Sequence, residues 1–166
     1  CLSARILLER IYLSRRLDRL VEEHNINIVE SIDWSGFLWH PPPVPLVVRM
    51  HGANTAYRYY QNKKPSRLLR FFERRNVRFA DHLIAVSEHI GKVTLRALGL
   101  EYKQYTVIYN GVDCQRFRDL GMPRHPAEIV LSGFISRRKG IFELLRAYAK
   151  TWQTRPDATL TLVGSL

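Results

Sequence analysis

The segment 127–150, AEIVLSGFISRRKGIFELLRAYAK, constrains the fold of this chain more than any other stretch. Its apolar run at 129–131 is typical of a buried strand, and the run ends at Gly133. The loop that follows carries three consecutive cations, Arg137, Arg138 and Lys139. Gly140 then precedes apolar residues at helical spacing. Because backbone N–H groups and the helix dipole favour anions at such a junction, the segment indicates a phosphate-bearing ligand or a solvated basic turn.

The rest of the chain alternates predicted strands with predicted helices. Short apolar runs predict strands at 26–30, 46–50, 82–86, 105–109, 129–131 and 159–163. Amphipathic spacing and capping residues predict helices at 2–21, 65–79 and 87–98, with Ser87 as an N-cap and Gly99 as a C-terminal stop. We expect 33–40 and 53–64 to be irregular. Solid apolar strands between helices are typical of an α/β fold with a Rossmann-like parallel sheet covered on both faces.

A segment without clear periodicity, 113–126, predicts a linker between two parts of the chain. Residues 1–112 then form the later part of one Rossmann-like domain, and residues 127–166 begin a second. The second part holds only strand, helix and strand, which is too little for an independently stable domain. The chain also begins with Cys1 and not with Met. We therefore expect an internal piece of a larger protein, incomplete at both ends.

The net charge of +11 favours anionic partners, which include nucleic acid, an acidic membrane surface and phosphorylated substrates. No zinc spacing or nucleic-acid-binding motif supports the first of these. The arginines and phenylalanines of 65–79 fit a membrane-surface helix, a nucleic-acid face or a core-packed helix with a solvated basic side. Two cysteines without a CxxC motif, and no apolar run of about 20 residues, favour a cytoplasmic location.

Two polar residues follow predicted strands directly. His51 comes after 46–50, and Ser87 comes after 82–86. Ligands of doubly wound sheets gather at the carboxyl ends of strands, where a histidine can donate a hydrogen bond or exchange a proton. Each residue also has a structural explanation, since His51 can simply close a strand and Ser87 can simply cap a helix. The sequence contains no HExxH metal motif and no Ser-His-Asp constellation.

Three segments in order resemble one enzyme family. They are LVVRMHG at 46–52, the stretch 80–113 with ADHLIAVSEHI and YTVIYNGVD, and SGFISRRKGIFELLRAY at 132–148. Together they resemble the retaining glycosyltransferases of the GT4 type, which have a GT-B fold of two facing Rossmann-like domains. The resemblance implies transfer of a sugar from a nucleotide-diphosphate sugar to an acceptor (a glycan, a lipid or a small molecule) with retention of configuration. It implies no cofactor and no metal.

The resemblance also assigns residues. His51 matches the catalytic histidine that faces sugar and acceptor, and Ser87 is a candidate on the acceptor side. Gly133 and Lys139 match the residues that admit and neutralise the donor diphosphate, and Arg137 and Arg138 are further candidates.

Phe134 departs from the family pattern, because many relatives carry arginine there. The paired donor-side glutamates would lie beyond residue 166, so we expect this chain to be inactive alone. Contact with the inner membrane face is a further expectation. The alternative function is a non-catalytic basic module that binds nucleic acid or an anionic membrane.

Overall fold

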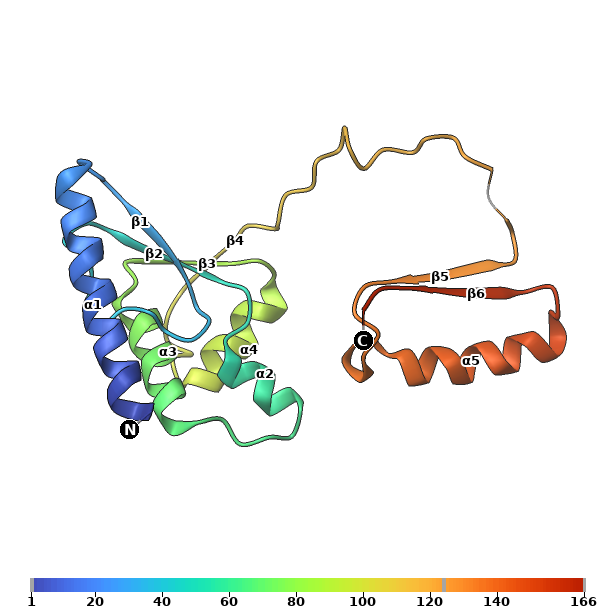
Figure 1. The fold of residues 1–166 in the computed structure, drawn as a ribbon, viewed down its shortest axis with the longest axis horizontal. Coiled ribbons are helices and arrows are strands. Elements are labelled where there is room, and N and C mark those ends of the chain that lie inside the picture. The colour runs from blue at the N-terminus through green and yellow to red at the C-terminus, as the bar shows by residue number, and fades with distance from the viewer. Residues whose placement is uncertain (1, 124, 166) are drawn as a thin grey trace. The chain divides into compact units, whose positions relative to one another are not determined.

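The computed structural model describes residues 2–123 and 125–165 (Figure 1). The chain divides into two compact units, Cys1–Val112 and Asp113–Leu166. Both units combine parallel strands with helices, as the predicted α/β fold requires. No described helix is long and apolar enough to cross a membrane.

The first unit is built on a four-stranded parallel sheet with the order β1-β2-β3-β4. Its strands are β1 (Val29–Ile32), β2 (Leu46–Met50), β3 (His82–Ala85) and β4 (Thr106–Val107). Alternate residues of β2, Leu46, Val48 and Met50, are fully buried in the core. Burying each of these side chains contributes roughly 1.5–3 kcal/mol. One face of β2, an inner strand of the sheet, therefore packs against the core.

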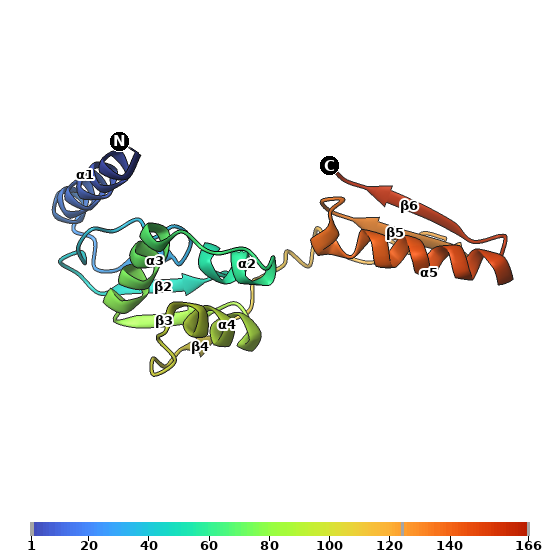
Figure 2. The same cartoon turned by 90° about the horizontal axis from the view of Figure 1, so that it is seen from below.

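The helices of this unit are α1 (Leu2–Glu23), α2 (Asn54–Tyr60), α3 (Arg67–Phe79) and α4 (Glu88–Leu98). Figures 1 and 2 show α2, α3 and α4 on one face of the sheet. On the opposite face, half-buried Arg49 pairs with the more exposed Glu30 at 2.7 Å. This face is more open than the predicted sheet covered on both sides.

The predicted start and end residues of the two helices within 65–98 are confirmed. The Ser66 hydroxyl accepts from Leu69 N at 3.4 Å and begins α3. The Ser87 hydroxyl accepts from Ile90 N at 3.2 Å and begins α4. Gly99 ends α4 in the left-handed conformation, with φ +66°. The local capping pattern therefore determined these helix ends.

One helix and several element ends differ from the predictions. The stretch 53–64, predicted to be irregular, contains α2. That prediction was wrong because α2 has no local capping side chain, and a distant carboxylate takes this role, as described below. Strand β1 begins three residues later than predicted, at Val29, and β4 comprises only Thr106–Val107.

The second unit contains β5 (Glu128–Ser132), a short 3-10 helix η1 (Arg137–Lys139), α5 (Ile141–Thr154) and β6 (Thr159–Val163). Strands β5 and β6 pair in parallel, and α5 connects them and runs alongside (Figure 2). The described residues between Asp113 and β5 form no helix or strand. The predicted strand, basic loop, helix and strand are all present, but the prediction that 129–131 is a buried strand was wrong, because Val130 of β5 is 56% exposed in this small unit.

Candidate functional site

Three polar residues follow the parallel strands of the first unit at one edge of the sheet. Asp33 comes directly after β1, His51 after β2, and Ser87 two residues after β3. Parallel strands place their carboxyl ends at the same edge, which is where α/β proteins gather their ligands. The edge is thus the first part of the candidate site.

The carboxylate of Asp33 organises this edge. Its Oδ1 accepts from the backbone N–H of His51, and its Oδ2 accepts from that of Gly52, each at 3.0 Å. Asp33 is completely buried. Burial raises the pKa of Asp33, the two N–H donors oppose this rise, and Glu73 adds to it by charge repulsion. Asp33 therefore holds the backbone at His51 while the histidine side chain stays exposed.

The loop after Asp33 is held by a buried arginine of α1. Arg10 Nε donates to Gly36 O and Arg10 Nη2 donates to Ser35 O, each at 2.7 Å. Its guanidinium carbon lies 4.4 Å from the centre of the Phe72 ring. Gly36 has φ +56°, and a Cβ there would lie 2.2 Å from the Phe72 backbone. Only glycine fits this contact, so the loop is tightly packed on α3.

A second buried carboxylate joins three segments. Glu73 of α3 is completely buried. Its Oε1 accepts from Ser35 N at 3.0 Å and from Asn54 N at 2.8 Å, and its Oε2 accepts from Thr55 N at 2.9 Å. Asn54 and Thr55 begin α2, where a negative charge also interacts favourably with the helix dipole. Glu73 thus fixes the helix that follows the His51–Gly52 turn.

The predicted site residues of this unit lie as follows. His51 and Ser87 end up at the same sheet edge, because β2 and β3 are paired neighbours. Gly52 has φ +108°, and a Cβ there would contact Ile90 of α4 at 3.5 Å. The Ser87 hydroxyl caps α4, so the explanation of Ser87 as a helix cap is correct.

In the second unit, the loop after β5 leads into α5 through η1. Gly133 has φ +128°, which favours glycine, although a Cβ there would meet no atom within 4 Å. Gly140 is left-handed, with φ +78°, and directly precedes the first residue of α5. The first N–H groups of this 14-residue helix have no intrahelical partner, so they can bind an anion.

The cations of this loop are exposed. Arg137, Arg138 and Lys139 form η1 and reach solvent. The Arg137 guanidinium lies 5.9 Å from the centre of the Phe142 ring. Phe134, which replaces the arginine of many relatives, is 63% exposed. The structure therefore brings the predicted phosphate-binding residues into one loop and orients Phe134 largely toward solvent.

Gly164 is a neighbour of Gly133 that the sequence interpretation did not assign. A Cβ at Gly164 would lie 1.8 Å from the carbonyl oxygen of Gly133. Gly133 N donates to Val163 O, and Ile135 N donates to Ser165 O, both at 2.9 Å. The loops that follow β5 and β6 thus pack backbone to backbone. In the sequence, the glycine directly after the predicted strand, in Val163-Gly164-Ser165, was the signal that could have identified this residue.

Asp33, Glu73 and Arg10 were also missed. Asp33 alone had a partial signal, since it comes three residues after the predicted strand 26–30, whereas His51 follows its strand directly. Among the described residues, no cluster of three or more His, Cys, Asp or Glu side chains could hold a metal ion.

Known proteins resemble this chain over most of its length. The family model described as Glycosyltransferase Family 4 matches residues 2–116. The chain is similar to the glycogen synthases of Mycobacterium tuberculosis strains CDC 1551 / Oshkosh and ATCC 25618 / H37Rv. It is 30% identical to each over 149 residues, which cover 83% of this chain and 35% of each relative. The chain therefore spans about a third of the length of these relatives.

Proposed function

This chain belongs to Glycosyltransferase Family 4, and from that premise we propose that it is part of a retaining sugar transferase. The donor is a nucleotide-diphosphate sugar, and the acceptor is a glycan, a lipid or a small molecule. The bond between the anomeric carbon and the diphosphate breaks, an acceptor hydroxyl oxygen bonds to that carbon with the original configuration, and the hydroxyl proton passes to the leaving diphosphate. The family match over residues 2–116 is the observation that carries the proposal.

His51 is the proposed residue that faces the sugar and the acceptor. Its exposed side chain extends from a backbone that the Asp33 carboxylate holds in place. A fixed backbone with a side chain open to ligands suits a group that donates or exchanges a proton. Ser87 lies at the same edge and is the proposed acceptor-side residue, with its hydroxyl already accepting from Ile90 N.

The loop of the second unit is the proposed diphosphate site. Gly133 allows the backbone to approach the donor, and Lys139 neutralises the phosphates just before the start of α5. A positive charge there stabilises the negative charge that grows on the leaving diphosphate. Arg137 and Arg138 are additional candidates for the same oxygens. We propose that these groups act without a metal ion, and turnover that persists in EDTA would support this.

We further propose that the 166-residue chain does not turn over a donor alone. The support is that the chain covers 35% of the length of each glycogen synthase relative. Activity is expected in a longer protein that contains this chain. Release of nucleotide diphosphate from a UDP- or GDP-sugar by the isolated chain would contradict the proposal.

Lys139→Ala in that longer protein tests the diphosphate site. Losing a charge-assisted contact to phosphate is expected to weaken donor binding about tenfold or more. Lys150→Ala is the matched control, because Lys150 is an exposed lysine of α5 outside the loop. Donor affinity that is unchanged in Lys139→Ala, or that falls equally in both variants, would count against the proposal.

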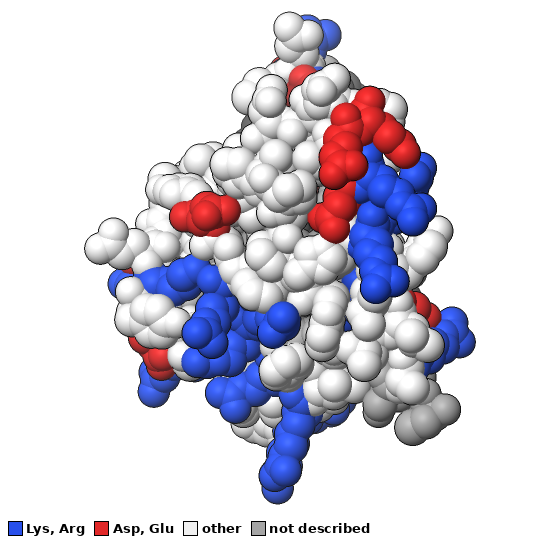
Figure 3. Space-filling model, turned by 90° about the vertical axis from the view of Figure 1, so that its left-hand side faces the viewer, with Lys and Arg blue, Asp and Glu red and all other residues white. Residues whose placement is uncertain are grey.

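The alternative is a non-catalytic basic module that binds nucleic acid or an anionic membrane. Lys and Arg side chains form broad patches on the face shown in Figure 3, and Arg67, Arg70, Phe71 and Arg74 line one groove. However, Arg70 Nε donates to Ala97 O, and Arg74 donates to Leu98 O and Gly99 O. These bonds to the end of α4 favour a packing role. Sedimentation with anionic vesicles, compared with neutral vesicles, separates the two functions.

A further inference from the structure

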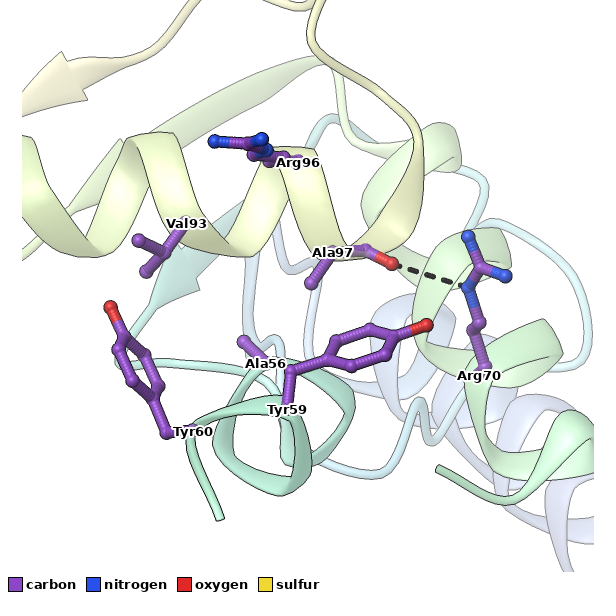
Figure 4. Close-up of a pocket in the computed structure, with 7 residues that line it drawn as sticks. All are labelled: Ala56, Tyr59, Tyr60, Arg70, Val93, Arg96 and Ala97. Carbon is purple, nitrogen blue, oxygen red and sulfur yellow. Dashed lines mark hydrogen bonds between the residues drawn. The ribbon is translucent and has the colours of Figure 1, made fainter. Parts of the chain in front are cut away.

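A cleft of about 440 Å³ opens on the first unit between α2 and α4 (Figure 4). Each of these helices lines it with three residues at the spacing i, i+3 and i+4, which lie on one helix face. They are Ala56, Tyr59 and Tyr60 on α2, and Val93, Arg96 and Ala97 on α4. This spacing spans about 6 Å along a helix, so the cleft has room for one large side chain.

The interior of the cleft offers apolar contacts and few hydrogen-bonding groups. Ala56, Val93 and Ala97 contribute aliphatic groups. The Tyr60 hydroxyl already forms a hydrogen bond with His89 Nε2 at 2.6 Å, which holds Tyr60 in place as one wall. A polar group that enters an apolar cleft loses its hydrogen bonds to water without replacing them. The interior is therefore suited to an apolar side chain.

A second hollow adjoins the cleft, because Arg70 of α3 lines both. Its other lining residues are Arg67, Phe71 and Arg74, and Phe71 is 49% exposed. Arg70 Nε donates to Ala97 O at 3.2 Å, the contact drawn as a dashed line in Figure 4. This bond fixes Arg70 between the two hollows. The surface as a whole can therefore contact a chain segment longer than the cleft itself.

The positive charges lie at separate places around the cleft. In Figure 4 Arg70 lies at one end, beyond Ala97, and Arg96 lies apart from it on α4. Arg96 and Arg67 are exposed, and within the described part of the chain their side chains make no hydrogen bond or ion pair. No residue that lines either hollow is acidic. A complementary partner carries carboxylates on either side of an apolar group.

The shape and chemistry of the cleft favour a protein segment over other anionic partners. A flat bilayer surface does not reach the floor of a concave cleft, whereas a single side chain does. The edges of a nucleic-acid base carry donors and acceptors that would be left unpaired in an apolar interior. A second copy packed through the same surface would bring the same arginines together, which is unfavourable.

We propose that this surface binds an acidic segment of a partner protein. One apolar side chain of the segment enters the cleft between α2 and α4, and carboxylates on either side of it pair with Arg70 and Arg96. An apolar anchor in a pocket with charges at its rim is a common arrangement of protein interfaces. Residues further along the segment contact Phe71 and Arg67. The inference does not depend on the proposed transfer reaction.

Peptide binding to the 166-residue chain, measured by fluorescence anisotropy, tests the anchor. The probe is a labelled peptide with a central phenylalanine and four glutamates on each side, and the comparison peptide has a central alanine. The phenylalanine peptide is expected to bind at least about tenfold more tightly, because only its ring fills the cleft. It should also shift the amide NMR signals of Ala56, Val93 and Ala97. Equal binding of the two peptides, or no shift at these amides, would overturn the inference.

The same amide signals distinguish the other occupants. The probes are a ten-nucleotide oligothymidine and vesicles of phosphatidylserine and phosphatidylcholine. Either one binding at these amides more tightly than the phenylalanine peptide would overturn the inference in favour of nucleic acid or a membrane. The signals of the free chain should not change with its concentration. A change at Ala56, Val93 and Ala97 would assign the cleft to a second copy instead.

Variants of α4 separate a direct contact from general attraction by charge. Arg96→Gln is expected to weaken binding of the phenylalanine peptide about fivefold or more. Lys92→Gln removes the same charge one turn earlier, from a lysine that pairs with Glu88 at 3.1 Å and does not line the cleft. It is expected to change binding less than twofold. Equal losses in the two variants would refute the proposed pairing at Arg96.

Ala97→Leu fills the cleft without a change in charge. It is expected to weaken binding of the phenylalanine peptide about fivefold or more and to leave the alanine peptide unaffected, because only the larger side chain needs the space. The dispersion of the NMR spectrum shows whether the variant is folded. Unchanged binding of the phenylalanine peptide to a folded variant would contradict the proposed place of the anchor.

Discussion

The carboxylate of Asp33 accepts the backbone N–H of His51 at 3.0 Å across the ends of two neighbouring strands. The same carboxylate accepts from Gly52. A buried side chain directly after β1 therefore sets the backbone from which the exposed His51 side chain extends. Stability, pH dependence and loop geometry in this region should all respond to that contact.

Asp33→Ala is expected to lower the free energy of unfolding by about 2–3 kcal/mol, because two backbone donors lose their partner. Asp33→Asn should lower the free energy of unfolding less, since its amide oxygen can still accept one of the two hydrogen bonds. Urea denaturation measures both. A loss in Asp33→Ala no larger than that of the exposed control Glu101→Ala would show that the contact contributes little.

The raised pKa of Asp33 predicts a specific pH dependence. Because burial makes folded Asp33 hold its proton more tightly than unfolded Asp33, stability falls as pH rises from the ordinary pKa near 3.8 through the raised value. Exposed carboxylates with lowered pKa values, such as Glu30, act in the opposite direction. They are present in both wild type and Asp33→Asn, so their effect cancels in the difference.

The measurement is the unfolding free energy of wild type minus that of Asp33→Asn, from urea titrations across the acid range. This difference should decrease as pH rises from the ordinary pKa of Asp33 to its raised pKa, and it should become constant above the raised pKa. A difference that stays constant, or that increases with pH, would contradict burial as the dominant influence on Asp33.

Glu73→Ala is expected to destabilise the first unit by about 3–4 kcal/mol, because Ser35, Asn54 and Thr55 each lose the acceptor of their N–H group. Glu73→Gln should retain part of this energy through its remaining oxygen. Amide hydrogen exchange should locate the damage at the start of α2. Unchanged protection at Thr55 would argue against Glu73 as the cap of this helix.

Gly36→Ala is expected to cost about 3 kcal/mol or more, since its Cβ would overlap the Phe72 backbone and its φ of +56° is unfavourable for alanine. Gly121→Ala is the control, because Gly121 also has positive φ, +64°, but has no atom within 4 Å of the added carbon. Thermal unfolding should show a loss of about 1–2 kcal/mol at most for Gly121→Ala, which is the cost of alanine at positive φ, so the larger loss in Gly36→Ala reports the overlap with the Phe72 backbone.

Gly164→Ala is expected to separate the two strand-end loops of the second unit, because the added carbon would strike the Gly133 carbonyl. The N–H groups of Gly133 and Ile135, which donate to Val163 O and Ser165 O, should then exchange with solvent at least about tenfold faster. Exchange rates that match wild type would mean that the loops tolerate a side chain there.

Much of the fold could be predicted from local patterns. Ser66, Ser87 and Gly99 mark helix ends because a cap acts on residues two to four positions away. The strands at 46–50 and 159–163 have the predicted bounds, since both runs are rich in β-branched and apolar residues, which favour strands. The basic loop before α5 was predicted for the same reason: strand, glycines, cations and helix lie within one short segment.

Less of the candidate site could be predicted from the sequence. The sequence places His51 and Ser87 at strand ends, but it does not reveal the buried side chains that hold the His51 backbone. Arg10 looked like one more arginine on the polar side of an amphipathic helix, yet it is buried against Phe72. Helix α2 was missed because its cap, Glu73, lies 18 residues beyond Thr55.

The sequence by itself therefore determined the α/β class, the helix ends and the family to which the chain belongs, because these depend on residues close together in the chain or on ordered motifs. Only the tertiary structure decided which charged residues are buried. A buried carboxylate or guanidinium is stable when hydrogen-bond partners surround it. Apart from Ile6 O, which accepts from Arg10 Nη1, the partners of Asp33, Glu73 and Arg10 come from segments 18 to 38 positions away, so no local pattern reveals them.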